Sequence, residues 1–332
     1  MNASVQTIGR QTYRIISKQK AVIAIALMLI AMLFSDSRFY TALNIMNIFK
    51  NATPNLIIAF GVTLVVICRA CDLSVGSVMA LSGILAVQLI NSGMNMYLAI
   101  LLAILSGAVV GFVNGFLVVH QKTEPFIITL GMGMLIKGVA LLLTNANPVP
   151  VTRGEKSDSF QAVAEHVVIR VAGIEIPNIV VFMVLILAFT YWLMRFTSFG
   201  RNCYALGGDY EVAENSGINV IRTKWIAFVI TGLYAAIAGV LMASRLNSGT
   251  AIIGDATPLF VNCAVVIGGT SFAGGVGGVG YSFLGIMVME ILRNGMNAFG
   301  INRFLQTMIL GIVIVSIIAL DCYAIKRKKE DV

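Results

Sequence analysis

The sequence predicts an all-α protein with about ten membrane-spanning helices, from its composition, the length of its apolar runs and the placement of its charges. Of its 332 residues, 58% are hydrophobic and 11% charged, whereas soluble domains carry about 25% charged residues. The net charge of +8 does not indicate nucleic-acid binding, because the basic residues gather at the ends of apolar runs. That pattern is typical of membrane topology.

The expected spans follow the chain in order, each ending where charged or turn-forming residues appear. They are 21–35, 53–70, 74–91, 97–119, 125–144, 176–194, 225–246, 259–271, 273–292 and 303–323. The eighth is too short for a full crossing, so we expect a broken or re-entrant helix there.

An internal similarity accompanies these spans. "VVICRACDLSVGSV" at 65–78 resembles "VVIGGTSFAGGVGGV" at 265–279. A parallel structural repeat would explain the similarity and would place a transport path at the interface between the two copies. Chance similarity between glycine-rich apolar stretches is the alternative.

The charges also orient the chain, because cytoplasmic loops carry an excess of lysine and arginine. The segment 1–20 contains basic but no acidic residues, and the tail 324–332 contains "KRKK", so both are expected in the cytoplasm. They flank a transmembrane permease domain, 21–323. Within it, 145–175 is slightly acidic and is expected to be an external loop. The basic residues Arg195, Arg201, Arg222 and Lys224 place the loop 195–224 inside.

"CRACDLSVGS" at 68–77 puts polar residues between two apolar runs. An ionisable side chain at the centre of a membrane helix costs about 2.5–3.5 kcal/mol, so it normally pairs or faces water. Arg69 and Asp72 have the i,i+3 spacing of a pair on one helix face. Asp72 also resembles a helix N-cap, so a path-closing ion pair and a simple structural cap both stay open. The candidates for the path or gate are Arg69, Asp72, Ser74, Asn114 and Thr129.

Two further segments are informative. Residues 196–225 predict a short helix between Tyr210 and Ser216, with Asp209 as N-cap and Gly217 as the stop. Such a helix offers a rigid knob to a partner protein, although an ordinary loop helix would look the same. The glycine-rich segment 268–280 lacks the lysine of a phosphate loop and is expected to let helices approach closely or the backbone break. Since no catalytic or metal-ligand constellation emerges, neither an enzyme nor a metal site is expected.

Four motifs resemble the permease subunits of bacterial ATP-binding cassette (ABC) importers for monosaccharides, of the ribose, galactose and xylose type. They are "DLSVGS" at 72–77, "GFVNGFLVVHQKTEPFIITLG" at 111–131, "FGRNCYALGGDYEVAENSGINV" at 199–220 and "VVIGGTSFAGGVGGVG" at 265–280. The resemblance implies a subunit of the bacterial inner membrane that pairs with a second permease, expected to be identical. It also implies an external sugar-binding protein and a separate ATPase that binds ATP and Mg²⁺, with no cofactor on this chain.

In that family the loop matching 207–220 contacts the ATPase, so the resemblance makes this loop the coupling site. The coupling candidates are Gly207, Gly208, Glu211, Ala213, Glu214, Ser216 and Gly217. One departure is the stretch before "DLSVG", where the family usually has two glycines and an apolar residue and this chain has Arg69, Ala70 and Cys71. It leaves the identity of the sugar open. The alternative function is a secondary transporter or channel that needs no ATPase, with Asp72 and Glu290 as its main ionisable candidates.

Overall fold

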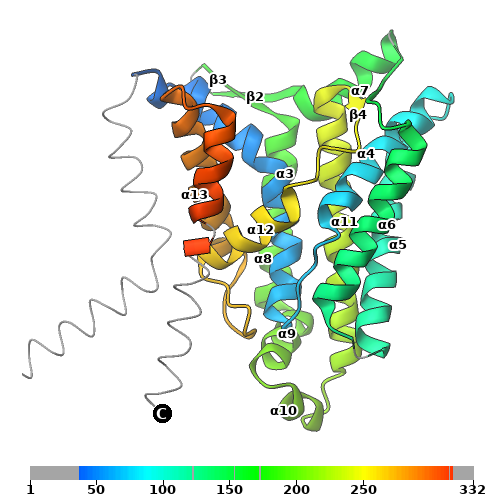
Figure 1. The fold of residues 1–332 in the computed structure, drawn as a ribbon, viewed down its shortest axis with the longest axis vertical. Coiled ribbons are helices and arrows are strands. Elements are labelled where there is room, and N and C mark those ends of the chain that lie inside the picture. Colours follow the sequence, from blue (N-terminus) through cyan, green and yellow to red (C-terminus); the bar gives the residue numbers. More distant parts are fainter. Residues whose placement is uncertain (1–36, 122, 153, 172, 314, 317–332) are drawn as a thin grey trace, which may run out of the picture.

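The structure is a computed structural model that describes residues 37–121, 123–152, 154–171, 173–313 and 315–316. Within them, helices run between two ends of the molecule (Figure 1). They are η1 (Ser37–Tyr40), α3 (Ala42–Ile67), α4 (Val75–Asn91), α5 (Met96–His120), α6 (Pro125–Thr144), α8 (Asn178–Phe196), α11 (Val220–Leu246), α12 (Thr257–Gly268), α13 (Val279–Ala298) and an apolar helix at Arg303–Val313. The expected first span, 21–35, and the expected cytoplasmic ends, 1–20 and 324–332, lie outside the described residues.

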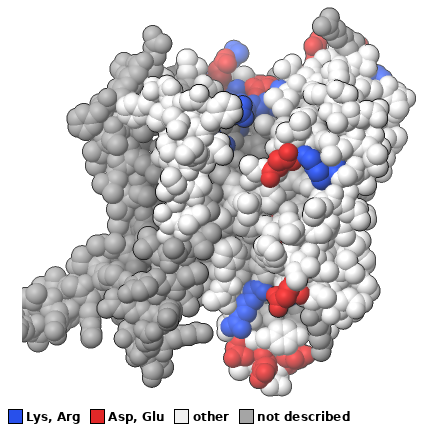
Figure 2. Space-filling view, viewed as in Figure 1, with Lys and Arg blue, Asp and Glu red and all other residues white. Residues whose placement is uncertain are grey.

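The described helices confirm the predicted all-α membrane fold. Five of them, α3, α5, α6, α8 and α11, are long and apolar enough to cross a membrane. Figure 2 shows charged atoms gathered mainly toward the two ends of the molecule, with a largely uncharged surface between them. This distribution fits a protein whose middle lies in hydrocarbon.

The two ends carry different elements. At one end lie α7 (Glu155–Glu165), the antiparallel hairpin of β2 (Val167–Val171) and β3 (Ile174–Pro177), and the short pair of β1 (Val149–Pro150) with β4 (Ser248–Gly249). At the other end lie α9 (Ser198–Gly208) and α10 (Tyr210–Asn215) (Figure 1). The loops 145–175 and 195–224 therefore lie at opposite ends of the molecule, as the charge pattern requires.

Helix α3 begins at Ala42, well before the expected boundary at residue 53. The sequence misplaced this boundary because polar residues precede it, yet the structure gives those residues partners. Asn44 donates to Asn294 Oδ1 (3.0 Å), and Lys50 forms an ion pair with Glu165 (2.7 Å). A membrane helix can include polar residues whose hydrogen-bonding groups are satisfied within the protein.

Helix α11 lies at the centre of the bundle and packs against α3, α4 and α5. Its contact with α5 depends on glycine. A Cβ atom at Gly107 would lie 2.3 Å from the Gly232 carbonyl oxygen, and one at Gly111 would lie 2.4 Å from the Phe228 carbonyl oxygen. The two backbones therefore touch, which is how small residues four apart hold membrane helices together.

The predicted internal similarity corresponds to a shared local structure. The first matched segment, 65–78, runs from the end of helix α3 through a non-helical break at Cys68–Ser74 to the start of helix α4. The second, 265–279, runs from the last turn of the 12-residue helix α12 through a break at Gly269–Gly278 to the first residue of helix α13. This confirms the expected helix break after the eighth run, and a Gly275 N–H···O=C Ile67 hydrogen bond of 3.0 Å joins the two breaks.

Candidate transport pathway and coupling site

Helix α3 ends in a left-handed turn at Arg69, whose φ is +55°. The Ala70 N–H then bonds the Val65 carbonyl (3.0 Å), which closes the helix end. A left-handed conformation costs a non-glycine residue roughly 1–2 kcal/mol. The Arg69 guanidinium offsets that cost by donating to the carbonyls of Gly207 (2.8 Å) and Gly208 at the C-terminal end of α9, where a cation is favoured.

The predicted Arg69–Asp72 pair is wrong. Asp72 instead accepts hydrogen bonds from the Ser74 N–H (2.8 Å) and the Ser74 hydroxyl (2.7 Å). The i,i+3 spacing applies only within a helix, and this segment lies between Ile67, where α3 ends, and Val75, where α4 begins. Asp72 thus accepts a hydrogen bond from the backbone just before α4, in agreement with the alternative interpretation of Asp72 as a structural cap.

The remaining path candidates meet around this break. The Asn114 side chain donates to the Ser74 hydroxyl (2.8 Å), and the Leu73 N–H donates to the Thr129 hydroxyl (3.1 Å). Asp72, Ser74, Asn114 and Thr129 are each at most 1% exposed. We call these four residues the buried polar network.

Sequence reasoning missed one further partner, Asn262 of α12. Its amide donates to the Asp72 carbonyl (3.1 Å) and to the Pro258 carbonyl (2.8 Å). The available signal was a lone amide within the apolar run "PLFVNCAVVIG". Asn262 therefore links α12 to the break between α3 and α4, while its buried Oδ1 has no hydrogen-bond partner among the described residues.

The loop expected to couple to the ATPase contains the predicted short helix, α10. Asp209 Oδ1 accepts from the Val212 N–H (3.1 Å) at its start, and Gly217 follows its end with φ of +78°. Ala213 is buried, whereas Glu211, Glu214 and Ser216 are exposed. Partial desolvation, followed by the nearby Glu214 carboxylate, raises the pKa of Tyr210 above its ordinary value. Helix α10 therefore packs against the protein through Ala213 and exposes its other side to a partner.

The C-terminal turn of α9 touches both helix breaks through backbone atoms. A Cβ atom at Gly207 would lie 1.9 Å from the Ile67 carbonyl oxygen and 2.3 Å from the Gly275 nitrogen. The Tyr204 hydroxyl also donates to the Gly277 carbonyl (3.0 Å). Through Gly207, helix α9, which leads into α10, therefore packs against both helix breaks.

Glu290, the other ionisable candidate of the secondary-transporter hypothesis, is buried in α13. It accepts from the Asn55 amide (2.9 Å) and lies 3.6 Å from the guanidinium of Arg293. Its charge is thus compensated within the protein. Among the residues that the structure describes, no group of three or more His, Cys, Asp or Glu side chains could hold a metal ion.

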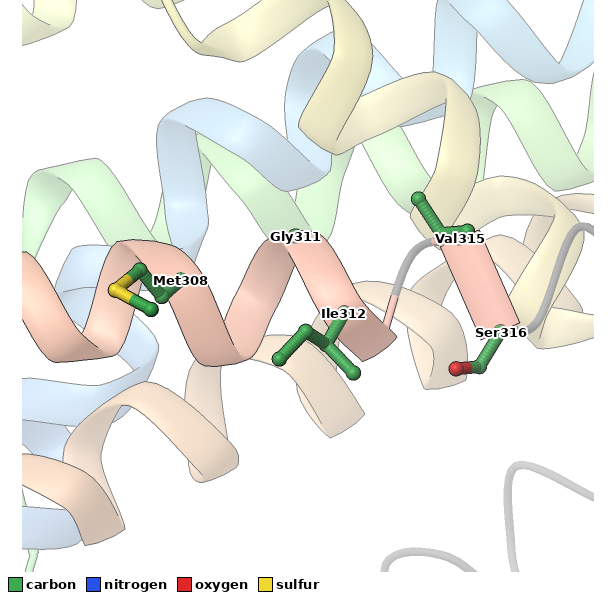
Figure 3. Close-up of a pocket in the computed structure, with 5 residues that line it drawn as sticks. All are labelled: Met308, Gly311, Ile312, Val315 and Ser316. Atoms are coloured by element: carbon green, nitrogen blue, oxygen red, sulfur yellow. The ribbon is translucent and has the colours of Figure 1, made fainter.

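An apolar groove of about 430 Å³ runs along the helix that begins at Arg303 (Figure 3). It is lined by Met308, Gly311, Ile312, Val315 and Ser316. Met308, Ile312 and Val315 are exposed, and exposed apolar side chains of a membrane helix suit contact with lipid. The groove offers few polar groups to a hydrophilic substrate.

Membrane-length helices, two broken helices joined at their breaks and an exposed short helix at one end define a polytopic membrane protein. The family described as the permease component of the branched-chain amino acid transport system matches residues 44–318, and the chain belongs to this family. No solved structure matches the chain significantly.

Several relatives cover most of the chain. It is 33% identical to the ribose import permease protein RbsC of Escherichia coli strain K12 over 304 residues, 92% of this chain and 93% of the relative. It is 36% identical to RbsC of Bacillus subtilis strain 168 over 292 residues, 88% of this chain and 87% of the relative. It is 29% identical to the galactose/methyl galactoside import permease protein MglC of E. coli K12 over 341 residues, 98% of this chain and all of the relative.

These similarities identify the class. The chain is the transmembrane subunit of an ABC importer, and it works with an ATPase on a separate subunit and with a substrate-binding protein. It is a multi-pass membrane protein of a bacterial import system.

Proposed function

We propose that this chain forms the pathway by which a monosaccharide moves from an external binding protein into the cytoplasm. The observation that carries the proposal is the similarity over nearly the whole chain to proteins named for ribose, galactose and allose import. The family description refers to branched-chain amino acids, so an amino acid is the competing substrate to test.

In this proposal α10 binds the ATPase and transmits its movement to the pathway. The contacts of α9 support this route, because Gly207 lies against Ile67 and Gly275 with no side chain between the backbones. A movement of α9 would displace both helix breaks together. The buried polar network ahead of α4 would then rearrange as the path opens, which gives Arg69, Asp72, Ser74, Asn114 and Thr129 their proposed part in gating.

The proposal also includes orientation and assembly. Both termini and α10 lie in the cytoplasm, and α7 with the β2–β3 hairpin lies at the outer face of the inner membrane. The basic residues of the loop 195–224 support this orientation. Two copies of the chain pair around the path, and ATP and Mg²⁺ bind the ATPase and not this chain.

The test is to purify the chain with the ATPase and binding protein encoded beside it and to measure ATP hydrolysis in lipid. A monosaccharide, together with its binding protein, should stimulate hydrolysis, whereas leucine, isoleucine and valine should not. Stimulation by the amino acids alone would contradict the assignment of a sugar substrate. Failure of any ATPase to bind the chain would contradict the proposed coupling.

A further inference from the structure

Lys137 lies inside a helix that is otherwise apolar. It is the thirteenth residue of α6, which extends over 20 residues from Pro125 to Thr144 and is long and apolar enough to span the membrane. Seven residues separate Lys137 from the end of α6 beside the external loop, which is about 10 Å at 1.5 Å per residue. An ammonium at this depth requires a partner or water.

The partner of Lys137 comes from the turn that leads into α12. Lys137 Nζ forms an ion pair with Asp255 and also donates to the Ala251 carbonyl (2.6 Å). Figure 1 shows this part of the chain descending from β4 at one end of the molecule to α12 near its middle. Neither residue was among the candidates that the sequence indicated.

This ion pair is accessible from outside the chain. The Asp255 side chain is 55% exposed and that of Lys137 is 24% exposed. Within the part of the chain that the structure describes, no group donates a hydrogen bond to the second carboxylate oxygen of Asp255. Figure 2 shows adjacent acidic and basic atoms at intermediate height on an otherwise largely uncharged face. A half-exposed carboxylate is costly against lipid tails, so this face must meet water or a polar molecule.

The ion pair lies close to the buried polar network. Gly133, one helical turn before Lys137, would place a Cβ atom 3.4 Å from Ser74 Cα. Gly254, next to Asp255, lies against Gly76 at the start of α4, where a Cβ atom would be 1.9 Å from the Gly76 carbonyl oxygen. The Lys137–Asp255 pair is therefore about one helical turn farther out along the same junction.

The geometry points to a substrate contact: Lys137 and Asp255 bind the hydroxyl groups of the sugar in the outer half of the pathway. This inference rests on the proposed function. A carboxylate with a free oxygen accepts hydrogen bonds from sugar hydroxyls, and the ammonium donates to a hydroxyl oxygen. Charge-assisted hydrogen bonds of this kind are the stronger ones. The ion pair would exchange part of its mutual contact for the sugar as it passes.

The first test is labelling of Asp255→Cys in proteoliposomes with a hydrophilic thiosulfonate reagent added from the external side, with the modified peptide identified by mass spectrometry. The cysteine should react, and binding protein loaded with the transported sugar should slow the reaction. An unreactive cysteine would overturn the inference, since the face would then be covered by lipid or protein.

The second test is sugar uptake by Asp255→Asn, with Glu175→Gln as the matched control. Glu175 is also a half-exposed carboxylate paired with a base, Arg170, but it lies in the β2–β3 hairpin. Loss of a charged hydrogen bond should reduce uptake at limiting sugar about ten- to hundredfold in Asp255→Asn. The control should match the native chain.

The outcomes separate the two proposals. If the native complex imports no monosaccharide, the proposed function fails. If the native complex imports sugar and Asp255→Asn imports it equally well, only the sugar contact fails. If both Asp255→Asn and the control lose uptake equally, the effect does not belong to the ion pair and the inference is again overturned.

Discussion

Replacement of Gly207 by alanine adds a single carbon atom to the contact between α9 and the two helix breaks, and so tests whether this contact couples ATP hydrolysis to transport. The added Cβ would lie 1.9 Å from the Ile67 carbonyl oxygen, 2.3 Å from the Gly275 nitrogen and 2.9 Å from the Gly275 Cα. All three are backbone atoms, so rotation of a side chain cannot relieve the clash. Reaching a separation of 3.0 Å from Ile67 requires a shift of about 1.1 Å in α9 or in the break.

The cost of this shift is on the order of 1–3 kcal/mol, typical of an overpacked interior. Each 1.4 kcal/mol corresponds to about a tenfold change in a population. The fraction of chains in which α9 packs against both breaks as in the native structure should therefore fall at least several-fold. We expect Gly207→Ala to hydrolyse ATP in the complex while importing several-fold less sugar per ATP. The assay is parallel measurement of phosphate release and sugar uptake in proteoliposomes.

Gly208→Ala is the control, because a Cβ atom at Gly208 would meet nothing within 4 Å. The adjacent substitution leaves the Gly208 carbonyl available to Arg69. It should therefore keep the native ratio of uptake to hydrolysis. If both variants behave like the native chain, or if both lose coupling equally, α9 is not seated through Gly207 and the reasoning is refuted.

Three further predictions follow from the same region and from the topology. Gly217→Val should reduce transport because φ is +78° there, whereas Gly217→Asn should retain most of it, since asparagine tolerates left-handed backbone; equal transport by the two variants would argue against a backbone requirement. A cysteine at exposed Asp158 should react with an impermeant thiol reagent from outside and one at exposed Glu214 should not, and the reverse pattern would invert the orientation. Arg69→Ala and Asp72→Ala should have additive effects on the free energy of unfolding to within about 0.5 kcal/mol, because Arg69 and Asp72 share no hydrogen-bonding partner. A larger coupling energy would show that the two side chains do interact as an ion pair.

The sequence predicted those features that depend on local chemistry. Asp209 and Gly217 predicted α10, and the structure confirms it with the Asp209 cap and the left-handed Gly217. The short run 259–271 predicted a broken helix, which α12 and the following glycine-rich break confirm. Each of these features follows from residues within a few positions of one another.

The features that the sequence did not predict correctly depend on contacts between residues far apart in the sequence. The partners of Arg69 are Gly207 and Gly208, nearly 140 residues away, and no local spacing indicates them. Lys137 was overlooked because its partner Asp255 lies in the turn before α12, more than 100 residues farther along the chain. Likewise, the start of α3 was misplaced because the distant residues that satisfy its polar turns are not visible in a local hydropathy pattern.

The most direct test of the central claim is ATP-driven uptake of radiolabelled monosaccharides into proteoliposomes that contain the chain, its ATPase and the loaded binding protein. A coupled sugar permease should accumulate the sugar inside above its external concentration, and only with hydrolysable ATP. Omission of the ATPase should abolish uptake, and labelled leucine should not accumulate. Sugar uptake that continues at the same rate without ATPase or ATP would contradict the account.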